Sequence, residues 1–293
     1  MSKKFKAIVI NNQNENFTRE VKELGTDVFK DGNVLVKIDY SGLNYKDALI
    51  LNNGGRIVKN YPFVPGIDFS GTVEESEDGK FKKGDRIILT GFRVGEVYFG
   101  GFAGYAKVNS SFLVKAPKEL TNLQTMMMGT AGFTALLCSF AIKAREELLM
   151  GEKVKDVLVT GATGGVGSIA VMVLSKMGYE VHAVTGKKDK HDYLKDLGAK
   201  NIIDRKEFHG ESKLLEKGIW DGVVDTVGGE SLTKILAQTK PNGIVAVCGN
   251  ANNNELNTSV VPFMLRGIKL WGMDSANCSI KRREFIWGEA SKL

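Results

Sequence analysis

The segment VLVTGATGGVG, residues 157–167, constrains the fold more than any other part of the chain. It begins with an aliphatic run typical of a buried parallel strand, and the apolar segment IAVMVLSKMG that follows it predicts a helix. Between the two, Gly161, Gly164 and Gly167 permit a tight turn and a close approach of the backbone to a ligand. Because the first N–H groups of a helix attract anions, this arrangement predicts a site for the pyrophosphate of a dinucleotide. The alternative is a glycine-rich turn that binds no ligand.

Strand-like and helix-like segments alternate from residue 157 onward. The strand-like segments are VLVTG, EVHAVTG, NIID, GVVDTVG and GIVAVCG, and helix-like segments such as HDYLKDLGA and SLTKILAQ lie between them. This alternation predicts an open, doubly wound parallel sheet with helices on both faces. The late segment GIKLWGM predicts one more strand, at an edge of the sheet.

The first half of the chain has a different pattern. FKAIVI, VLVKIDY, FSGTVEE and DRIILTG alternate apolar and polar residues or carry β-branched runs, and glycine turns separate them. They predict a β-rich domain with barrel-like closure. Near Leu123 the pattern changes to an apolar helix, LQTMMMGTAGFTALLCSFAI. We therefore expect an α/β protein with a β-rich domain in residues 1–122 and a nucleotide-binding domain in residues 123–275.

Composition excludes several classes of protein. The 293 residues suit two domains, and a hydrophobic content of 43% with 25% charged residues is typical of a globular protein. No stretch reaches the roughly 20 apolar residues that a membrane span needs, and the N-terminus predicts a strand rather than a signal peptide. Cys138, Cys248 and Cys278 are widely separated, which argues against disulfides and a structural zinc site. These features predict a cytoplasmic protein.

The net charge of +6 is modest. It favours anionic ligands or simply reflects a solvated, lysine-rich surface. No basic block with interleaved aromatic residues predicts binding of nucleic acid.

The residues after the second strand of the nucleotide unit bear on the choice of cofactor. A carboxylate at this strand end usually accepts the ribose 2′-hydroxyl of NAD, but here Thr185, Gly186 and Lys187 follow the strand. A hydroxyl and cations would instead hold the 2′-phosphate of NADP(H), and Arg205 after the third strand supplies a further cation. The alternative is a lysine-rich loop without a ligand.

The strand GIVAVCGN ends at residues 248–250, where ligands gather in a doubly wound sheet. Asn250 is therefore a candidate contact for the nicotinamide half of the cofactor. Cys248 has the chemistry of a nucleophile, but no activating base is close in sequence, so we predict a small buried apolar residue.

Several motifs together resemble the medium-chain dehydrogenase/reductase superfamily, and the resemblance runs over nearly the whole chain. They are similar to its zinc-independent, quinone-oxidoreductase-like branch and, more narrowly, to its acrylyl-CoA reductases. The motifs are LNYKDAL (43–49), PGIDFSGTV (65–73), LTGFRVGE (89–96), GTAGFTA (129–135), DTVGG (225–229) and PFMLRGIKLWGMDS (262–275). The resemblance implies a GroES-like first domain, a Rossmann second domain, a homodimer and NADP(H) as cofactor. It also implies that residues 276–293 start a return to the first domain, and that the chain lacks the family's C-terminal segment and ends inside a helix.

The resemblance also bears on zinc. Zinc-dependent relatives carry a cysteine and a His–Glu pair at the positions of Asn44 and Ile67–Asp68. An asparagine and an isoleucine cannot complete a tetrahedral zinc set, so we expect no metal.

The resemblance further assigns residues to the site. It implies a cofactor set of Tyr45, Thr163, Gly164, Gly165, Val166, Thr185, Gly186, Lys187, Arg205, Asn250, Met264 and Ser275. Asn44 and Tyr45 are the expected catalytic residues, because an amide can stabilise a developing oxyanion and a phenol can donate a proton.

The neighbours of the catalytic pair have two interpretations each. Lys46 and Asp47 are expected to be structural, as an ion pair or a helix cap. Asp68 is either a catalytic acid or the buried partner of a cation such as Lys46. Thr130 either begins a helix that points to the cofactor or belongs to a close-packed segment.

The predicted reaction is NADPH-dependent reduction of the C=C bond of an α,β-unsaturated acyl-CoA, acrylyl-CoA to propionyl-CoA. Two alternatives stay open. One is a quinone or enone reductase of the same branch, and the other is an NADP-binding protein without enzymatic activity.

Overall fold

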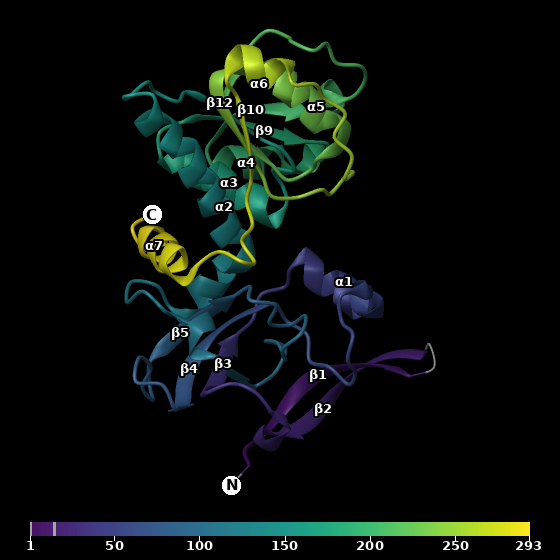
Figure 1. The fold of residues 1–293 in the computed structure, drawn as a ribbon, viewed down its shortest axis with the longest axis vertical. Coiled ribbons are helices and arrows are strands. Elements are labelled where there is room, and N and C mark those ends of the chain that lie inside the picture. Colours follow the sequence, from purple (N-terminus) through teal and green to yellow (C-terminus); the bar gives the residue numbers. More distant parts are fainter. Residues whose placement is uncertain (1, 14–15) are drawn as a thin grey trace. The chain divides into compact units, whose positions relative to one another are not determined.

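A computed structural model describes residues 2–13 and 16–293 (Figure 1). The chain folds into two compact units. The first contains Met1–Phe133 and Ser275–Lys292, and the second contains Thr134–Asp274 with Leu293. The chain passes from the first unit to the second inside one long helix and returns just before Ser275.

The second unit is built on a six-stranded parallel sheet. Its strands are β8 (Asp156–Val159), β9 (Glu180–Thr185), β10 (Ala199–Asp204), β11 (Trp220–Asp225), β12 (Thr239–Val247) and β13 (Lys269–Gly272). Their order is β10-β9-β8-β11-β12-β13, the order of a doubly wound dinucleotide-binding sheet. The order reverses between β8 and β11, which pair in parallel through Leu158 and Val223. The predicted α/β fold with a parallel sheet is confirmed.

Helices connect these strands on both faces of the sheet. They are α3 (Gly165–Lys176), α4 (His191–Asp196), α5 (Gly229–Gln238) and α6 (Val261–Arg266). The crossovers through α3 and α5 lead away from the centre of the sheet in opposite directions, so right-handed connections place the two helices on opposite faces (Figure 1). The short 3-10 helices are η4 (Lys188–Lys190) and η5 (Arg205–Phe208). Leu158, Val223, Leu236 and Val245 form part of a fully buried core between sheet and helices.

The first unit contains two antiparallel sheets. One is a hairpin of β1 (Lys4–Gln13) and β2 (Asn16–Gly25). The other has the order β6-β3-β4-β5-β7, formed by β3 (Val34–Tyr40), β4 (Asp68–Ser76), β5 (Arg86–Thr90), β6 (Tyr105–Val108) and β7 (Val114–Lys115). In this sheet β6 and β7 are the two outer strands, so the described ladder does not close on itself as a barrel would. Three 3-10 helices, η1 (Thr26–Val28), η2 (Gly54–Arg56) and η3 (Ser110–Phe112), and the helix α1 (Tyr45–Asn53) complete this part of the unit.

The long helix α2 (Asn122–Leu148) is interrupted at Gly129. This glycine has φ 51° and ψ −152°, a conformation that ends the first helical segment and lets a second one begin at Thr130. By length and composition, α2 is apolar enough to cross a membrane, contrary to the prediction that no such stretch exists. However, 72% of its apolar window is buried inside the protein, so its apolar side chains form core contacts.

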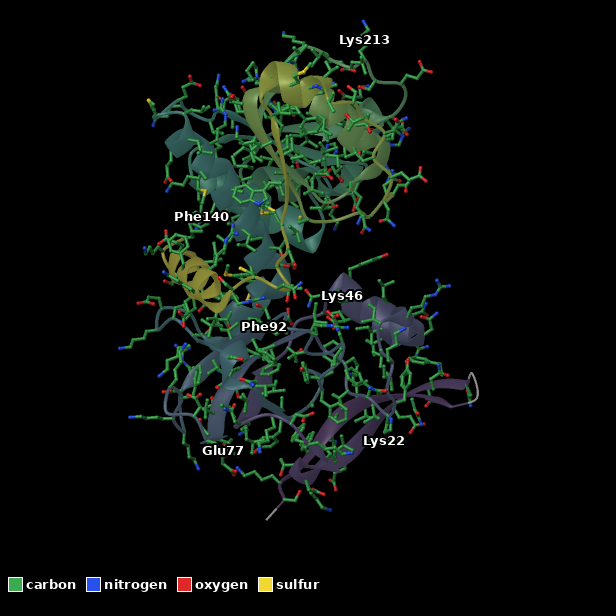
Figure 2. All side chains as sticks on the ribbon, viewed as in Figure 1. Lys22, Lys46, Glu77, Phe92, Phe140 and Lys213 are labelled. Carbon is green, nitrogen blue, oxygen red and sulfur yellow. The ribbon has the colours of Figure 1, made fainter. Side chains whose placement is uncertain are left out.

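Helix α7 (Ile280–Ala290) belongs to the first unit and is held by a buried arginine. Arg283 donates to the carbonyl oxygens of Ser275 (2.6 Å), Ala276 (2.9 Å) and Cys278 (2.9 Å). Its guanidinium also lies 4.4 Å from the ring centroid of Phe92, which Figure 2 labels. Arg283 therefore fixes the backbone of residues 275–278. The helix ends at Ala290, so the expectation that the chain ends inside a helix is wrong.

A half-buried tyrosine gives the second unit a predicted response to alkaline pH. Burial, with the negative charge of Glu146 nearby, raises the pKa of Tyr179 to about 12. The folded state thus prefers the neutral phenol more strongly than the unfolded chain does. This contribution to stability is fully present below about pH 10 and is lost as the pH rises through 12. In urea unfolding across this range, we expect Tyr179→Phe to gain stability relative to the wild type. A difference that does not depend on pH would contradict this assignment.

Candidate active site

The turn between β8 and α3 is fixed by hydrogen bonds to the end of β11. Thr160 Oγ1 donates to Asp225 Oδ1 (2.7 Å), and the Thr226 N–H donates to Thr160 Oγ1 (3.0 Å). Asp225 also accepts the Gly228 N–H (2.9 Å), and its burial raises the pKa of the carboxyl group. These bonds join the two strands between which the sheet order reverses, the place where doubly wound proteins bind ligands.

The glycines of this turn are required by close contacts. Gly161 has φ +57°, and a Cβ there would lie 2.3 Å from Thr226 Oγ1. A Cβ on Gly167 would lie 2.3 Å from the carbonyl oxygen of Gly161. The first turn of α3 therefore packs directly on the loop backbone. Gly164 is the N-cap, so the N–H groups of Gly165 and Val166 lie in the first turn, where a helix leaves N–H groups unpaired.

Replacing Gly167 tests this packing. We expect Gly167→Ala to lower the free energy of unfolding by about 2–3 kcal/mol, because backbone atoms must move to admit the methyl group. Gly288→Ala on α7 is the matched control, since its Cβ would meet no atom within 4 Å. That variant should be unchanged or slightly more stable in denaturant unfolding. Equal stability of the two variants would contradict the close packing of α3.

A cavity of about 540 Å³ opens beside this turn, at the carboxyl ends of the strands. Five of the sequence-predicted cofactor residues line it: Thr163, Thr185, Gly186, Lys187 and Arg205. The other described lining residues are Thr160, Gly161, Val184, Phe208, His209, Val227, Ser231, Ala251 and Asn252. None of these described residues is a carboxylate, whereas Lys187 and Arg205 are cations. The cavity therefore suits an anionic ligand.

Arg205 and Gly186 are in close contact within this cavity. A Cβ on Gly186 would lie 2.7 Å from Arg205 Nε, so only a glycine lets the guanidinium cross the turn after β9. Thr185 is buried, and its Oγ1 accepts the Lys187 N–H (3.1 Å). The structure thus brings together the four residues predicted to bind a 2′-phosphate.

Other predicted cofactor residues lie elsewhere. Asn250 is exposed, donates to Asn254 Oδ1 and is not among the described lining residues of the cavity. Met264 lies on α6 with 70% of its surface exposed. Tyr45 and Ser275 belong to the first unit. Asn252 and His209 also line the cavity, but the sequence analysis did not select them. The rule that ligands bind at the carboxyl ends of parallel strands, which selected Asn250, applies to the loops that contain these two residues as well.

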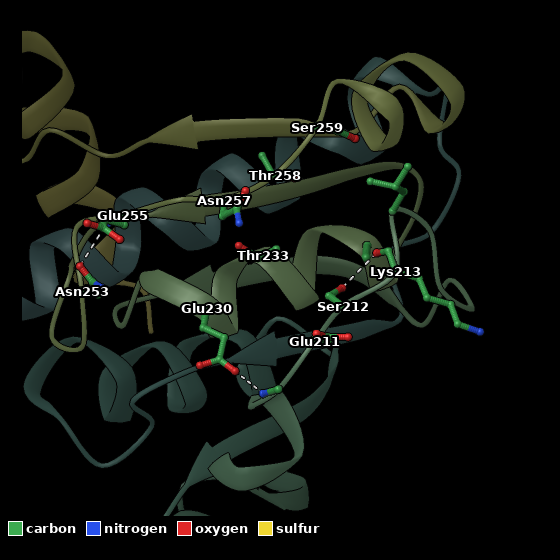
Figure 3. A pocket seen from close by; sticks show the side chains of 13 residues that line it. Glu211, Ser212, Lys213, Glu230, Thr233, Asn253, Glu255, Asn257, Thr258 and Ser259 are labelled. Atoms are coloured by element: carbon green, nitrogen blue, oxygen red, sulfur yellow. Dashed lines mark hydrogen bonds between the residues drawn. The ribbon is translucent and has the colours of Figure 1, made fainter.

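A second cavity of about 720 Å³ lies on α5 and the loops beside it (Figure 3). Glu211, Glu230 and Glu255 line it, and Lys213 is the one cation among its described lining residues. Three carboxylates repel a phosphorylated ligand, so the smaller, cationic cavity is the better dinucleotide site despite its size.

Cys248, at the end of β12, is only half-buried, so the predicted full burial is wrong. Its Sγ contacts the carbonyl oxygen of Asp225 at 3.5 Å. A hydrogen bond with Cys248, together with burial, raises the pKa of the Cys138 thiol. Cys138 is therefore a protonated, buried thiol rather than a nucleophile.

The predicted catalytic residues begin α1 in the first unit. Asn44 is the N-cap, and it forms a capping box with Asp47, whose Oδ2 accepts the Asn44 N–H (2.8 Å). The helix starts at Tyr45, so the predicted capping role of Asp47 is confirmed. Tyr45 is 76% exposed, so its hydroxyl is accessible.

Asn44 also joins two buried carboxylates. Its Nδ2 donates to Asp47 Oδ2 (3.1 Å) and to Asp68 Oδ2 (2.9 Å). Asp47 Oδ1 accepts the Ile67 N–H (3.0 Å), and Asp68 accepts the N–H groups of Gly42 (2.9 Å) and Thr130 (2.8 Å). Every carboxylate oxygen of the pair thus accepts at least one N–H. Burial, and less so the charge of Asp68, raises the pKa of Asp47 against these hydrogen bonds.

This network shows which groups Asp68 contacts and tests its predicted pairing with Lys46. Its oxygens accept N–H donors, one of them at the start of the second segment of α2, where helix polarity favours an anion. Lys46 instead pairs with Glu96, with 2.7 Å between Nζ and Oε1. The predicted pairing of Asp68 with Lys46 is therefore wrong, and the role of Asp68 as a catalytic acid stays a prediction. The Asn44 amide can donate a hydrogen bond to a substrate oxygen only if one of its two hydrogen bonds to the carboxylates is broken.

The parallel sheet, the cationic cavity at its reversal point and the accompanying antiparallel unit define a dinucleotide-dependent oxidoreductase. A zinc-binding dehydrogenase family model matches residues 165–286, and an alcohol dehydrogenase GroES-like domain model matches residues 30–118. The chain belongs to the medium-chain dehydrogenase/reductase superfamily, in its quinone-oxidoreductase-like branch.

Individual relatives agree with this placement. The chain is 44% identical to the acrylyl-CoA reductase AcuI of Ruegeria pomeroyi over 97% of this chain and 86% of the relative. The yhdH oxidoreductase from Salmonella enterica, solved in complex with NADP, has a TM-score of 0.94 and 44% identity, covering 98% of this chain and 87% of that one. The Bacillus subtilis protein yhfP, solved with NAD bound, has a TM-score of 0.94 and 41% identity, covering 99% of this chain and 88% of that one.

Proposed function

We propose that this protein uses NADPH to reduce the C=C bond of an α,β-unsaturated acyl-CoA, with acrylyl-CoA as substrate and propionyl-CoA as product. The choice of NADPH as cofactor rests on one observation, the cationic cavity in which the Arg205 side chain lies across Gly186. The similarity to AcuI over nearly the whole chain supports the substrate.

The residues present fit NADPH better than NADH. Thr185, Lys187 and Arg205 would hold the 2′-phosphate, since a hydroxyl and two cations suit a dianion. The N–H groups of Gly164, Gly165 and Val166, with Thr163, would bind the pyrophosphate at the start of α3. We assign the remaining contacts to Tyr45, Asn250, Met264 and Ser275.

NADPH, when bound, supplies the hydride that adds to the β-carbon of the conjugated thioester. Negative charge then develops on the thioester oxygen, which must be stabilised by hydrogen-bond donors. We assign that role to Asn44, on exchange of one of its carboxylate bonds, and to the Tyr45 hydroxyl. Because Asp47 and Asp68 already accept N–H donors at every oxygen, the accessible phenol of Tyr45 is the better proton donor.

The reaction as proposed needs no zinc. Asn44 directs its amide N–H groups at carboxylates, and Ile67 contributes only its backbone N–H to Asp47. A conjugated thioester is already activated for hydride addition, so a Lewis acid is not required.

The decisive experiment follows NADPH absorbance with acrylyl-CoA as substrate. A menaquinone analogue and NADH serve as parallel controls. Turnover that requires both acrylyl-CoA and NADPH would support the proposal, and Tyr45→Phe should then lower kcat more than it changes the KM for NADPH. Turnover with the quinone alone would favour a quinone reductase, and cofactor binding without turnover would favour a non-enzymatic NADP-binding protein.

Two further features belong to the same proposal. Strand β13 ends the parallel sheet, and all four of its residues are exposed, so we assign it to a homodimer in which it pairs with its twofold mate. Analytical ultracentrifugation that finds only monomers would remove this idea. The free thiols of Cys138 and Cys248 support a location in the reducing cytoplasm.

A further inference from the structure

His209 follows η5 directly and lines the same cavity as Lys187 and Arg205. Asp204 caps η5, because its Oδ1 accepts the Lys206 N–H (2.9 Å), and Phe208 is buried in the core of the second unit. The His209 N–H donates to the carbonyl oxygen of Lys206 (3.1 Å). This short, fixed helix therefore presents Arg205 at its start and His209 just past its end to one cavity.

The charges around His209 favour a role toward an anion. Lys187 reaches the cavity from the turn after β9, and Arg205 reaches it from η5. On the side of α5, the Glu230 carboxylate accepts the Gly210 N–H, and it lines the neighbouring cavity with Glu211 and Lys213 (Figure 3). On η5 itself, Lys206 and Glu207 are exposed and are not among the described lining residues.

We propose that His209 is a specificity-determining residue whose imidazolium binds the 2′-phosphate of NADP(H) together with Thr185, Lys187 and Arg205. This rests on the proposed use of NADPH and adds a pH dependence to it. A histidine ordinarily titrates near pH 6.5, whereas lysine and arginine stay charged throughout the physiological range. The contribution of His209 to the preference for NADP(H) over NAD(H) therefore rises as the pH falls.

Linkage gives the proposal a second consequence. If protonated His209 binds the phosphate, the phosphate must equally favour protonation of His209. Binding of NADP+ near neutral pH therefore takes up a proton, and binding of NAD+, which lacks the 2′-phosphate, does not.

The test is calorimetric titration of NADP+ and NAD+ between about pH 5.5 and 8.5. At the acidic end, we expect His209→Asn to bind NADP+ about fivefold more weakly than the wild type, as for one partly exposed ion pair. At the alkaline end, the two proteins should agree within about twofold, and NAD+ binding should be the same throughout. The titration of the phosphate itself is common to both proteins and cancels in the comparison. Repeating the NADP+ titration in buffers of different ionisation enthalpy measures the proton uptake on binding. His209→Asn should lack this uptake.

His191→Asn is the matched control, because this histidine begins α4 and does not line the cavity. It should leave NADP+ binding unchanged at every pH. Equal weakening of NADP+ and NAD+ by His209→Asn would overturn the proposal, since it would indicate a contact to the shared part of the cofactor. Equal NADP+ binding by wild type and variant at acidic pH would also overturn it. If the wild type binds neither cofactor, the proposed function itself fails.

Discussion

Asp68→Ala is expected to lower the free energy of unfolding by about 3–5 kcal/mol. The substitution removes the acceptor for the N–H groups of Gly42 and Thr130 and one of two acceptors for the Asn44 amide. These donors then lose a partner in a buried site, and α2 loses the anion at the start of its second segment. Denaturant unfolding monitored by circular dichroism measures the loss. The pKa of Asp47 should also fall, because the charge of Asp68 contributes to raising it.

Asp39→Ala is the matched control for this experiment. Asp39 is an exposed aspartate of β3 that accepts hydrogen bonds from Asn122 Nδ2 (2.6 Å) and Thr72 Oγ1 (3.3 Å). Because water can replace an exposed acceptor, its removal should cost less than about 1 kcal/mol. A similar loss for both variants would show that burial of the Asp68 network is unimportant for stability.

Arg205→Gln is expected to raise the Kd for NADP+ by about 30- to 100-fold, equivalent to about 2–3 kcal/mol. The variant keeps a hydrogen-bonding side chain but loses the cation that crosses Gly186. The Kd for NAD+ should change by less than about threefold, because NAD+ has no 2′-phosphate. Calorimetric titration of both cofactors measures the ratio directly.

Lys206→Gln removes the same charge one residue away. Lys206 is exposed and is not among the described lining residues of the cavity, so its replacement should leave both Kd values nearly unchanged. If Lys206→Gln and Arg205→Gln weaken NADP+ binding equally, the effect comes from the net charge of the surface and not from a bound phosphate.

The nucleotide-binding unit was predictable because its signals are local. The central strands of this parallel sheet are buried on both faces, so β8, β11 and β12 contain apolar runs that the sequence shows directly. Gly161 and Gly167 mark the turn, and the residues after β9 and β10 are close in space because parallel strands end at one edge.

Other features depend on contacts that local patterns do not encode. Strand β2 was missed because most of its residues are exposed, so it lacks the alternation that marks a half-buried strand. The partners of Asp68 come from Gly42, Asn44 and Thr130, on three separate segments. Only the tertiary fold shows that these donors hydrogen-bond to both oxygens of Asp68 and that Lys46 forms an ion pair with Glu96 instead.

The shared hydrogen bonds of Asn44, Asp47 and Asp68 restrict how this lineage can change over evolutionary time. A single replacement at any of the three removes a hydrogen-bond partner from a buried carboxylate or from a donor beside it. Substitutions there should therefore be inherited jointly, with two or three positions changing together between related sequences. A change of residue type at Asn44 that alters the chemistry of the site therefore requires simultaneous changes at the other positions. The exposed neighbour Tyr45 is not subject to this constraint.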